Sequence, residues 1–483
     1  MSVMPAILEI AVVGLGLVLI VLDLWTPREQ RPRLVIMAAF ALALILGASF
    51  WLQPAAPTYA FGTVYVLDGL ALFFKRLFLL AAILVLLLSR EWAVRLEGGL
   101  VEYGGLILFA LAGMMFAASA NDFSLLFVAI ELISVSFYIL VAFQHSYRAS
   151  LEAGVKYLIL GGLASALLVY GIALVFGSAG TLSFDQPGMR AAAAKLSPVF
   201  LLGLALVLAG LGFKISAVPF QVWTPDIYQG GPTPTTAFLA IGSKAAGIVL
   251  LLRVLFGVVP EVTLTWRPLL MVMAGLSIMY GSLCAIPQRN LKRLLGYSSI
   301  AHAGYLLLGV AVISAAGLAA VLFYLGSYLF AVAAAFTVIG LVGRESEAED
   351  LDALAGLHQR SPLLAATLAL AMMSLAGLPP LAGFFGKFLI LKAVLQAGGQ
   401  QVAYYYLLAI ALAGVVVSLY YYLGVVRAIY WSRPVAGNQS PLPVSRLIRC
   451  SLYGCLAGML YLGLFPGSLL AAAVEAVKVF AFK

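Results

Sequence analysis

The chain has 483 residues, of which 64% are hydrophobic and only 10% are charged, and it carries a formal net charge of +9. Soluble domains carry roughly 25% charged residues, so this composition, with a mean hydropathy of +1.10, excludes a soluble enzyme. The basic residues are scattered through the loops without the aromatic-interleaved patch that nucleic-acid binding needs. The cysteines and histidines lack the spacing of metal ligands, so we expect no metal site. We also expect no catalytic residue on this chain.

Apolar runs long enough to cross a hydrocarbon core of ~30 Å recur along nearly the whole chain. The first run lacks the basic segment and cleavage site of a signal peptide, so we expect it to remain as a helix. With Pro, Gly and charged residues taken as boundaries, the runs predict an all-α membrane protein of about fourteen helices. The predicted helices span residues 5–25, 34–52, 68–89, 104–119, 122–143, 151–177, 197–223, 235–258, 268–286, 293–313, 317–342, 361–397, 403–430 and 447–465.

Positive charges are distributed unequally between the two sets of loops. If the N-terminus lies outside, fifteen basic residues fall in the inner loops and five on the outer side. Inner loops of membrane proteins carry an excess of Lys and Arg. We therefore expect both termini on the outer side. Two termini on the same side of the membrane require an even number of helices.

Two of the predicted helices, 197–223 and 361–397, are too long for one crossing and contain residues that interrupt a helix. Irregular backbone at membrane depth is tolerated only where protein covers it or where it lines a wet cavity, so each break is a candidate ion site. The breaks are predicted at Gly212 and Pro219 in the first helix and at Pro379, Pro380, Gly383 and Gly386 in the second.

The two breaks lie five helices apart, and an odd offset inverts the topology of a repeat. Two spacings agree, because Lys214 and Lys387 are 173 residues apart and Glu131 and His302 are 171 residues apart. We predict N-terminal helices in 1–103, two inverted five-helix repeats in 104–258 and 259–430, and a last helix in 431–483. Chance similarity among Leu-, Ala- and Gly-rich segments is the alternative.

Several ionisable side chains fall deep inside predicted helices, where each charge costs at least ~2.5–3.5 kcal/mol without a partner or water. Glu131 and Lys244 lie about ten residues from a helix end, which is ~15 Å deep, and Lys214 and Lys387 lie at the breaks. Burial disfavours a charged lysine, so it can carry a proton near neutral pH. A lysine paired with Glu131 holds its proton and an unpaired one releases it, which gives a switch.

A purely structural role is the alternative for each of these residues. Glu131 can be a hydrogen-bonded strut, Lys214 a static partner of Glu131, and Lys156 a side chain that reaches the inner surface. His302, a candidate relay because its unperturbed pKa is near 6.5, can be a satisfied core histidine. Lipid or interface contacts are expected for the basic residues nearer helix ends, which are Lys75, Arg76, Arg253 and Lys392.

Four runs of residues carry a family resemblance that covers nearly the entire chain. They are KISAVPFQVWTPDIYQGGPTPTTAFLAIGSKAAG, NLKRLLGYSSIAHAGYLLLG, LAGLPPLAGFFGKF and DGLALFFK. Together they resemble the antiporter-like subunit N family of proton-pumping NADH:quinone oxidoreductase, the bacterial respiratory complex I. The pattern DIYxGxPTP is more similar to subunit N than to the sister subunits L and M.

This resemblance implies an antiporter-like fold with broken helices seven and twelve, in the inner (plasma) membrane of a bacterium. It implies that partner subunits hold the FMN, the iron–sulfur clusters and the quinone, so that this chain binds no cofactor and performs no redox chemistry. The implied partners are the M- and L-type subunits, small membrane subunits and the peripheral redox arm. The residues implied in proton transfer are Glu131, Lys156, Lys214, Lys244, His302 and Lys387.

Other functions share parts of this pattern. A cation/proton antiporter subunit of the Mrp type and a membrane subunit of a membrane-bound hydrogenase have the same fold and lysines. A passive scaffold would not need lysines at mid-membrane depth. A quinone anchor would need an aromatic pocket, whereas the tyrosine clusters 404–406 and 420–422 are expected to be packing or interface belts. Copurification with flavin and iron–sulfur subunits would separate the pump from the antiporter.

Overall fold

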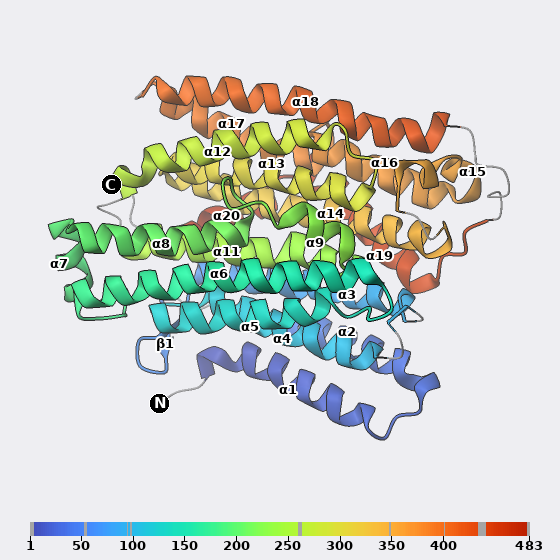
Figure 1. Ribbon diagram of the computed structural model, residues 1–483, viewed down its shortest axis with the longest axis horizontal. Coiled ribbons are helices and arrows are strands. Elements are labelled where there is room, and N and C mark those ends of the chain that lie inside the picture. The colour runs from blue at the N-terminus through green and yellow to red at the C-terminus, as the bar shows by residue number, and fades with distance from the viewer. Residues whose placement is uncertain are drawn as a thin grey trace.

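The computed structural model describes residues 4–52, 56–93, 95–96, 99–258, 263–346, 349–399, 401–432 and 441–480. Figure 1 shows a bundle whose long helices run side by side between two ends that carry the connecting loops. Within the described residues, thirteen helical segments are long and apolar enough to cross a membrane. The interrupted helix predicted over 361–397 adds a fourteenth crossing, so the predicted all-α membrane protein is confirmed.

The first half of the chain contains a short hairpin and the first broken helix. In chain order its elements are η1 (Met4–Ala6), α1 (Ile7–Asp23), η2 (Arg28–Gln30), α2 (Arg31–Ser49), β1 (Thr58–Ala60), β2 (Tyr65–Leu67), α3 (Gly69–Glu91), α4 (Leu100–Ala118), α5 (Phe123–Val141), α6 (Arg148–Ala179), α7 (Pro187–Lys195), α8 (Pro198–Ile215), α9 (Thr224–Gly230), α10 (Thr233–Phe238), η3 (Leu239–Ser243), α11 (Lys244–Leu252) and η4 (Arg253–Val258). The segments α10, η3, α11 and η4 form one continuous crossing, in which η3 and η4 are π-helical.

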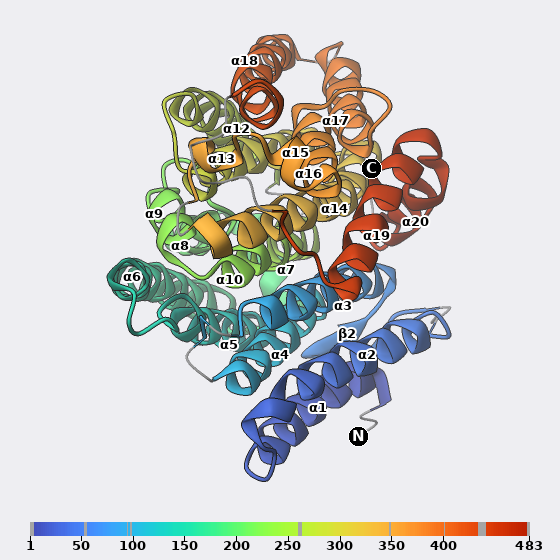
Figure 2. The same ribbon diagram turned by 90° about the vertical axis from the view of Figure 1, so that its right-hand side faces the viewer.

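The second half contains the second broken helix, formed by α16 and α17. Its elements are α12 (Thr263–Ala285), α13 (Leu291–Ala311), α14 (Ala315–Ser346), η5 (Leu351–Leu354), α15 (Leu357–Arg360), α16 (Pro362–Ala376), α17 (Ala382–Gly398), α18 (Ala403–Trp431), α19 (Arg446–Leu464) and α20 (Gly467–Val477). Figure 2 shows α1 and α2 at one edge of the bundle and α18 at the opposite edge. The helix α14 lies inside and packs against α13, α16, α17, α19 and α20.

Polar residues begin several of the long helices. The side chain of Asp68 accepts a hydrogen bond from the Ala71 N–H over 2.8 Å at the start of α3. The side chain of Asn290 accepts one from the Arg293 N–H over 3.0 Å at the start of α13. The first N–H groups of a helix have no partner within the helix, so such caps fix where these helices begin.

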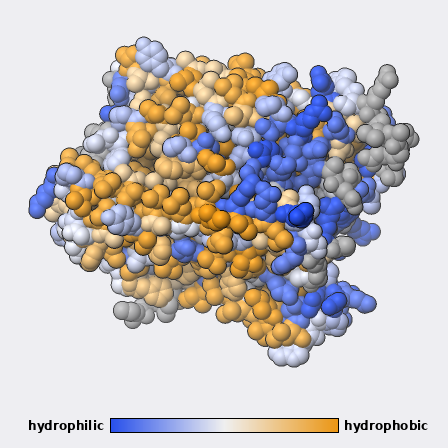
Figure 3. Space-filling view, viewed as in Figure 1, coloured by the Kyte–Doolittle hydropathy of each residue, from blue (hydrophilic) through white to orange (hydrophobic). Residues whose placement is uncertain are grey.

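The two ends of the bundle differ in polarity. Both termini, the hairpin and α7 lie at one end (Figure 1). Figure 3 shows apolar residues over the sides of the bundle and a large hydrophilic area at the opposite end. The apolar sides fit a protein surrounded by lipid, and the position of the termini at one end fits the expected even number of crossings.

A short hairpin and the helices α7 and α20 are among the elements that were not predicted. The strands β1 and β2 pair in antiparallel fashion with Thr58 opposite Leu67. The helices α7 and α20 have 9 and 11 residues, which at 1.5 Å per residue is too short to cross a membrane. α20 packs on α3 and α14 instead of crossing alone. Elements of this length have no extended apolar run, so hydropathy gives no signal for them.

Candidate functional site

The first break lies between α8 and α9. α8 ends at Ile215, and Ser216 adopts a left-handed φ of 62° that turns the chain away from the helix axis. The Ala217 N–H donates to the Gly212 carbonyl over 2.9 Å, which satisfies a carbonyl near the helix end. Gly212 therefore lies in the last turn of α8. Pro219, which has no N–H to donate, lies in the irregular segment before α9.

The second break lies between α16 and α17. Gly377 ends α16 with a φ of 91°, a conformation that favours glycine, and Pro379 and Pro380 follow it. Gly383 lies in the first turn of α17, where a Cβ atom would stand 1.8 Å from the Ser374 carbonyl oxygen. The two half-helices therefore approach each other so closely that only glycine fits at this position.

Glu131 on α5 and Lys214 on α8 belong to one polar cluster without pairing directly. Ser165 on α6 donates to Glu131 Oε1 over 2.5 Å, and Lys214 Nζ donates to Ser134 Oγ over 2.6 Å. Glu131 and Ser134 share one face of α5 because they are one turn apart. The ion pairs among the described residues do not include Glu131 with Lys214, so the structure does not show the static pair considered as an alternative. Lys214 is 5% exposed.

Lys244 directly follows the π-helical segment η3 and reaches α13. Its Nζ atom donates to both the carbonyl oxygen and the Oγ atom of Ser299. Ser299 Oγ also lies 3.1 Å from the Tyr228 hydroxyl and accepts a weak hydrogen bond from the Tyr328 hydroxyl at 3.5 Å. Lys244 is 2% exposed, so a buried ammonium group is surrounded here by neutral oxygens.

His302 lies one turn along α13 in a cluster of hydroxyl groups. Its Nδ1 atom contacts the Tyr324 hydroxyl, and its Nε2 atom lies 2.9 Å from the Tyr422 hydroxyl. The Tyr422 hydroxyl in turn contacts Ser298 Oγ, and the Tyr328 ring lies 5.0 Å from the histidine ring. Tyr422, from the 420–422 cluster expected to serve in packing or as an interface belt, is buried and forms hydrogen bonds in this cluster.

Lys387 lies on the second half of its broken helix. Its Nζ atom donates over 2.9 Å to the carbonyl of Ala376, the last residue of α16, and lies 5.2 Å from the centre of the Tyr305 ring. A Cβ atom at Gly386 would stand 2.4 Å from Tyr324, so this glycine lets α17 pack closely on α14. Lys387 thus lies beside Tyr305, and the residue before it packs on Tyr324, the tyrosine that contacts His302.

A small void lies beside Lys214, where α5, α8 and α11 meet. It has a volume of about 10 Å³, and its lining includes Lys214, Gly247 and Ser243, the residue before Lys244. A water molecule needs roughly 10–15 Å³ measured in this way. The void is therefore at the lower limit of the space that one water beside Lys214 needs.

Lys156 lies apart from the buried lysines, at the hydrophilic end of the bundle. It lines an open cavity of about 970 Å³, and its Nζ atom pairs with Glu152 at 2.7 Å and with Asp226 at 2.9 Å. Arg293 pairs with the second oxygen of Asp226 at 2.6 Å. Burial opposes ionisation of Asp226, but these hydrogen bonds outweigh it and hold the pKa of this carboxyl below its usual value.

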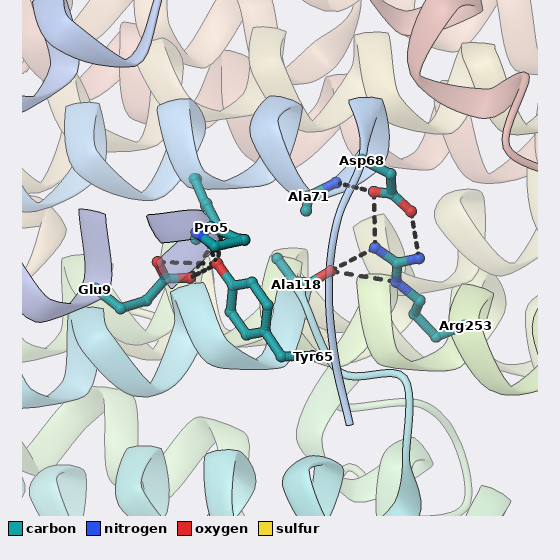
Figure 4. Close-up of polar contacts among 8 residues, drawn as sticks. Pro5, Glu9, Tyr65, Asp68, Ala71, Ala118 and Arg253 are labelled. Carbon is teal, nitrogen blue, oxygen red and sulfur yellow. Dashed lines mark hydrogen bonds and ion pairs between the residues drawn. The ribbon is translucent and has the colours of Figure 1, made fainter. Parts of the chain in front are cut away.

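Two buried ion pairs at the other end correct an expectation from the sequence. Lys75 and Glu9 are both fully buried and pair at 2.8 Å, and the Tyr65 hydroxyl accepts from Lys75 over 2.7 Å and donates to Glu9. Arg253 pairs with Asp68 through two hydrogen bonds of 2.6 and 2.9 Å (Figure 4). Lipid or interface contacts are therefore wrong for Lys75 and Arg253, because packing against other helices buries both.

The polar partners were largely missed from the sequence. Ser134, Ser165 and Tyr324 each lie in an apolar helix, where a lone hydroxyl is common and carries little signal. Asp226 carried a stronger signal, because it is an acidic residue directly after a predicted break, within the DIYQGGPTP motif. Neutral side chains that form hydrogen bonds with a buried ionisable residue cannot be found from charge patterns alone.

The chain is similar to known proteins over most of its length. Residues 120–415 match the family described as NADH:quinone oxidoreductase/Mrp antiporter, TM. NADH-quinone oxidoreductase subunit N of Desulforamulus reducens is 40% identical over 477 residues, which cover 98% of each chain. The protein of the same name from Rhodospirillum rubrum is 41% identical over 433 residues, 88% of this chain and 87% of that one.

Solved structures agree with these relatives. A chain of respiratory complex I from Thermus thermophilus with bound aureothin matches with a TM-score of 0.81 at 36% identity, covering 97% of this chain and 99% of that one. A chain of the Mrp complex from a Dietzia species matches with a TM-score of 0.86 at 23% identity, covering 99% and 98%. At that identity the second match is a similarity of fold alone.

Proposed function

Because the chain belongs to the NADH:quinone oxidoreductase/Mrp antiporter family and matches subunit N relatives over nearly its full length, we propose that it translocates protons as a membrane subunit of NADH:quinone oxidoreductase. It is a multi-pass membrane protein. The electron transfer takes place in partner subunits, which hold the FMN, the iron–sulfur clusters and the quinone, and no step of that chemistry uses a side chain of this subunit.

The observation that carries the proposal is the environment of three of the buried lysines. Lys214, Lys244 and Lys387 each donate to neutral oxygens, and none belongs to an ion pair within the described part of the chain. A buried ammonium with a carboxylate partner is fixed in its charged form, whereas one with neutral acceptors can gain or lose a proton. These lysines are therefore suited to pass a proton on.

The cluster at Glu131 supplies the switch. Lys214 now binds Ser134, one helical turn from Glu131 on the same face of α5. Movement of the Lys214 side chain from Ser134 to Glu131 pairs it with a carboxylate, which holds its proton, and the return movement releases the proton. A change of charge in a neighbouring subunit biases this choice because Glu131 is only partly buried by this chain.

The route through the chain uses hydroxyl groups and ring nitrogens between the lysines. Protons arrive from the cavity at Asp226, and Tyr228, two residues further along α9, contacts Ser299 beside Lys244. From there the tyrosines around His302 lead towards Lys387. With both termini in the periplasm, the cavity faces the cytoplasm across the inner membrane of a bacterium.

The partners follow from the same proposal. We assign the chain to a complex with M- and L-type antiporter-like subunits, small membrane subunits and the peripheral redox arm. The partly exposed Glu131 supports a neighbouring subunit on the α5 face, since a carboxylate left to lipid at this depth is strongly unfavourable. Copurification tests this assignment, because an Mrp-type antiporter would copurify without flavin and iron–sulfur subunits.

Two lysines of one helix give a matched test of proton transfer. Lys387 on α17 is 4% exposed, whereas Lys392 on the same helix is exposed. In vesicles containing the assembled complex, we expect Lys387→Ala, Lys214→Ala and Glu131→Gln to lower the rate of proton pumping at least about tenfold, the equivalent of ~1.4 kcal/mol in activation free energy. Lys392→Ala should pump normally. Full pumping by the Lys214→Ala complex would remove Lys214 from the route.

A further inference from the structure

The helical segment that carries Lys244 has an unusual construction. The nine residues of α11 (Lys244–Leu252) lie between the two π-helical segments η3 and η4. A cation stands at each end, because Lys244 is the first residue of α11 and Arg253 directly follows the last. These Cα atoms are ~13.5 Å apart at 1.5 Å per residue. π-helical turns are rare and often mark functional sites.

The two ends of α11 are held by different chemistry. At one end, Lys244 donates to the neutral oxygens of Ser299 and lies 6.0 Å from the centre of the Tyr328 ring, without an ion pair among the described residues. At the other end, Arg253 meets the Asp68 carboxylate in a two-pronged ion pair and donates twice more to the Ala118 carbonyl, over 2.8 and 3.2 Å. Paired Arg–carboxylate hydrogen bonds are strong and fix the geometry of both groups. The Arg253 end is therefore the rigid one.

Asp68 is itself held in place from a separate part of the fold. Figure 4 shows its carboxylate between the Arg253 guanidinium and the Ala71 N–H at the start of α3. The Ala118 carbonyl that also binds Arg253 is at the end of α4. Arg253 is thus anchored to two helices that do not include α13, which carries the partner of Lys244.

The other neighbours of α11 are sensitive to its position along the helix axis. A Cβ atom at Gly247 would stand 2.7 Å from Ile215 at the end of α8, so α11 and α8 are in close contact beside Lys214. The 10 Å³ void lies along the same side of α11. A slip of α11 by one residue would shift Lys244 by ~1.5 Å and rotate it by ~100°, which would separate it from Ser299.

We propose that Asp68 and Arg253 are positioning residues, which fix the register of α11 and thereby hold the Lys244 ammonium on the oxygens of Ser299. The two π-helical segments allow α11 to change register, and the ion pair selects the register in which Lys244 is bound. Neither residue carries the proton. This inference rests on the proposed role of Lys244 in proton transfer.

The test compares this ion pair with an equally buried one that does not touch α11. In vesicles containing the assembled complex, Asp68→Asn and Arg253→Lys are compared with Glu9→Gln, which weakens the pair with Lys75. We expect both positioning variants to oxidise NADH while moving several-fold fewer protons per electron. The pH profile of pumping should shift by about one pH unit, the effect of losing one hydrogen bond to a charged group. Glu9→Gln should leave this profile unchanged.

Arg253→Lys keeps the positive charge, so the positioning role can still be tested with this variant if the Asp68→Asn complex does not assemble. An unchanged proton yield and pH profile in either assembled variant would overturn the positioning role. An equal shift in Glu9→Gln would also overturn it, because the effect would then reflect general loosening of this end of the bundle.

Lys244→Ala in the same vesicles separates the two levels of the proposal. If Lys244→Ala abolishes pumping while Asp68→Asn pumps with a normal profile, only the positioning role fails. If Lys244→Ala pumps normally, the proton-transfer role of Lys244 fails and the positioning role falls with it.

Discussion

Two sets of buried cations in this protein differ in the charge of their partners: one set binds neutral oxygens and the other binds carboxylates. In the middle of the bundle, Lys214, Lys244 and Lys387 donate to a serine hydroxyl, to serine oxygens and to a backbone carbonyl. At the end that carries the termini, Lys75 and Arg253 pair with the carboxylates of Glu9 and Asp68. Both sets are almost fully buried, so burial does not distinguish them.

This contrast fits the proposal that one protein separates proton transport from anchoring. A carboxylate beside a buried cation keeps both groups charged, because neutralising either group would leave the charge of its partner buried and unpaired. A neutral oxygen solvates the ammonium without fixing its charge. The carboxylate pairs therefore hold helices together, while the lysines with neutral partners remain free to exchange protons.

The largest expected effect is on stability, at an anchoring pair. Lys75→Ala leaves the fully buried Glu9 carboxylate without its cation, which typically destabilises a protein by ~3–5 kcal/mol. We expect a clearly lower melting temperature and poor incorporation into the complex. The double variant Glu9→Gln, Lys75→Met removes both charges and should recover most of the loss. Equal instability of the single and double variants would contradict the anchoring role.

The next effect converts an exchangeable lysine into an anchored one. Ser299→Asp places a carboxylate beside Lys244 Nζ, which now donates to the two Ser299 oxygens. The new pair should fix the proton on Lys244 and lower proton pumping at least about tenfold, or ~1.4 kcal/mol. Vesicle acidification measures this effect, and Ser299→Asn is the neutral control of similar size. Normal pumping by Ser299→Asp would show that a carboxylate partner does not fix the proton on Lys244.

A smaller effect is expected where a neutral partner is removed. Ser134→Ala deletes the hydroxyl that accepts from Lys214, and a hydrogen bond to a charged group contributes ~1.5–3 kcal/mol. Because Glu131 is one turn away and can replace Ser134, we expect only a several-fold loss of pumping, measured against Ser136→Ala on the same helix. A complete loss would show that Ser134 has no substitute.

The smallest effect concerns the open cavity. Hydrogen bonds from Lys156 and Arg293 hold the pKa of Asp226 below its usual value, so its ionised form stabilises the fold at neutral pH and loses this effect as the pH falls through the lowered pKa. Partly exposed pairs contribute ~1 kcal/mol or less. Asp226→Asn should therefore melt slightly below the wild type at pH 7, and the difference should vanish well below about pH 4. A constant difference would exclude this ion pair as its cause.

Local features of the sequence are enough to predict the class of protein, the positions of the long helices and the family. Apolar runs of membrane length are local features, and the predicted ranges fall close to those of the helices that cross the bundle. The family resemblance drawn from four motifs is confirmed by relatives about 40% identical over nearly the whole chain. The division into repeats at residues 104, 259 and 431 and the proton-transfer roles remain predictions.

Which side chains contact one another could be seen only in the folded protein. The partner of Lys244 is 55 residues away on another helix, and Lys214 binds Ser134 in place of the charged residue that the sequence suggested. Lys75, expected near lipid, is enclosed with Glu9 from α1. The reason is physical: hydropathy fixes that a helix crosses the membrane, but its rotation and its neighbours depend on packing between helices far apart in the chain.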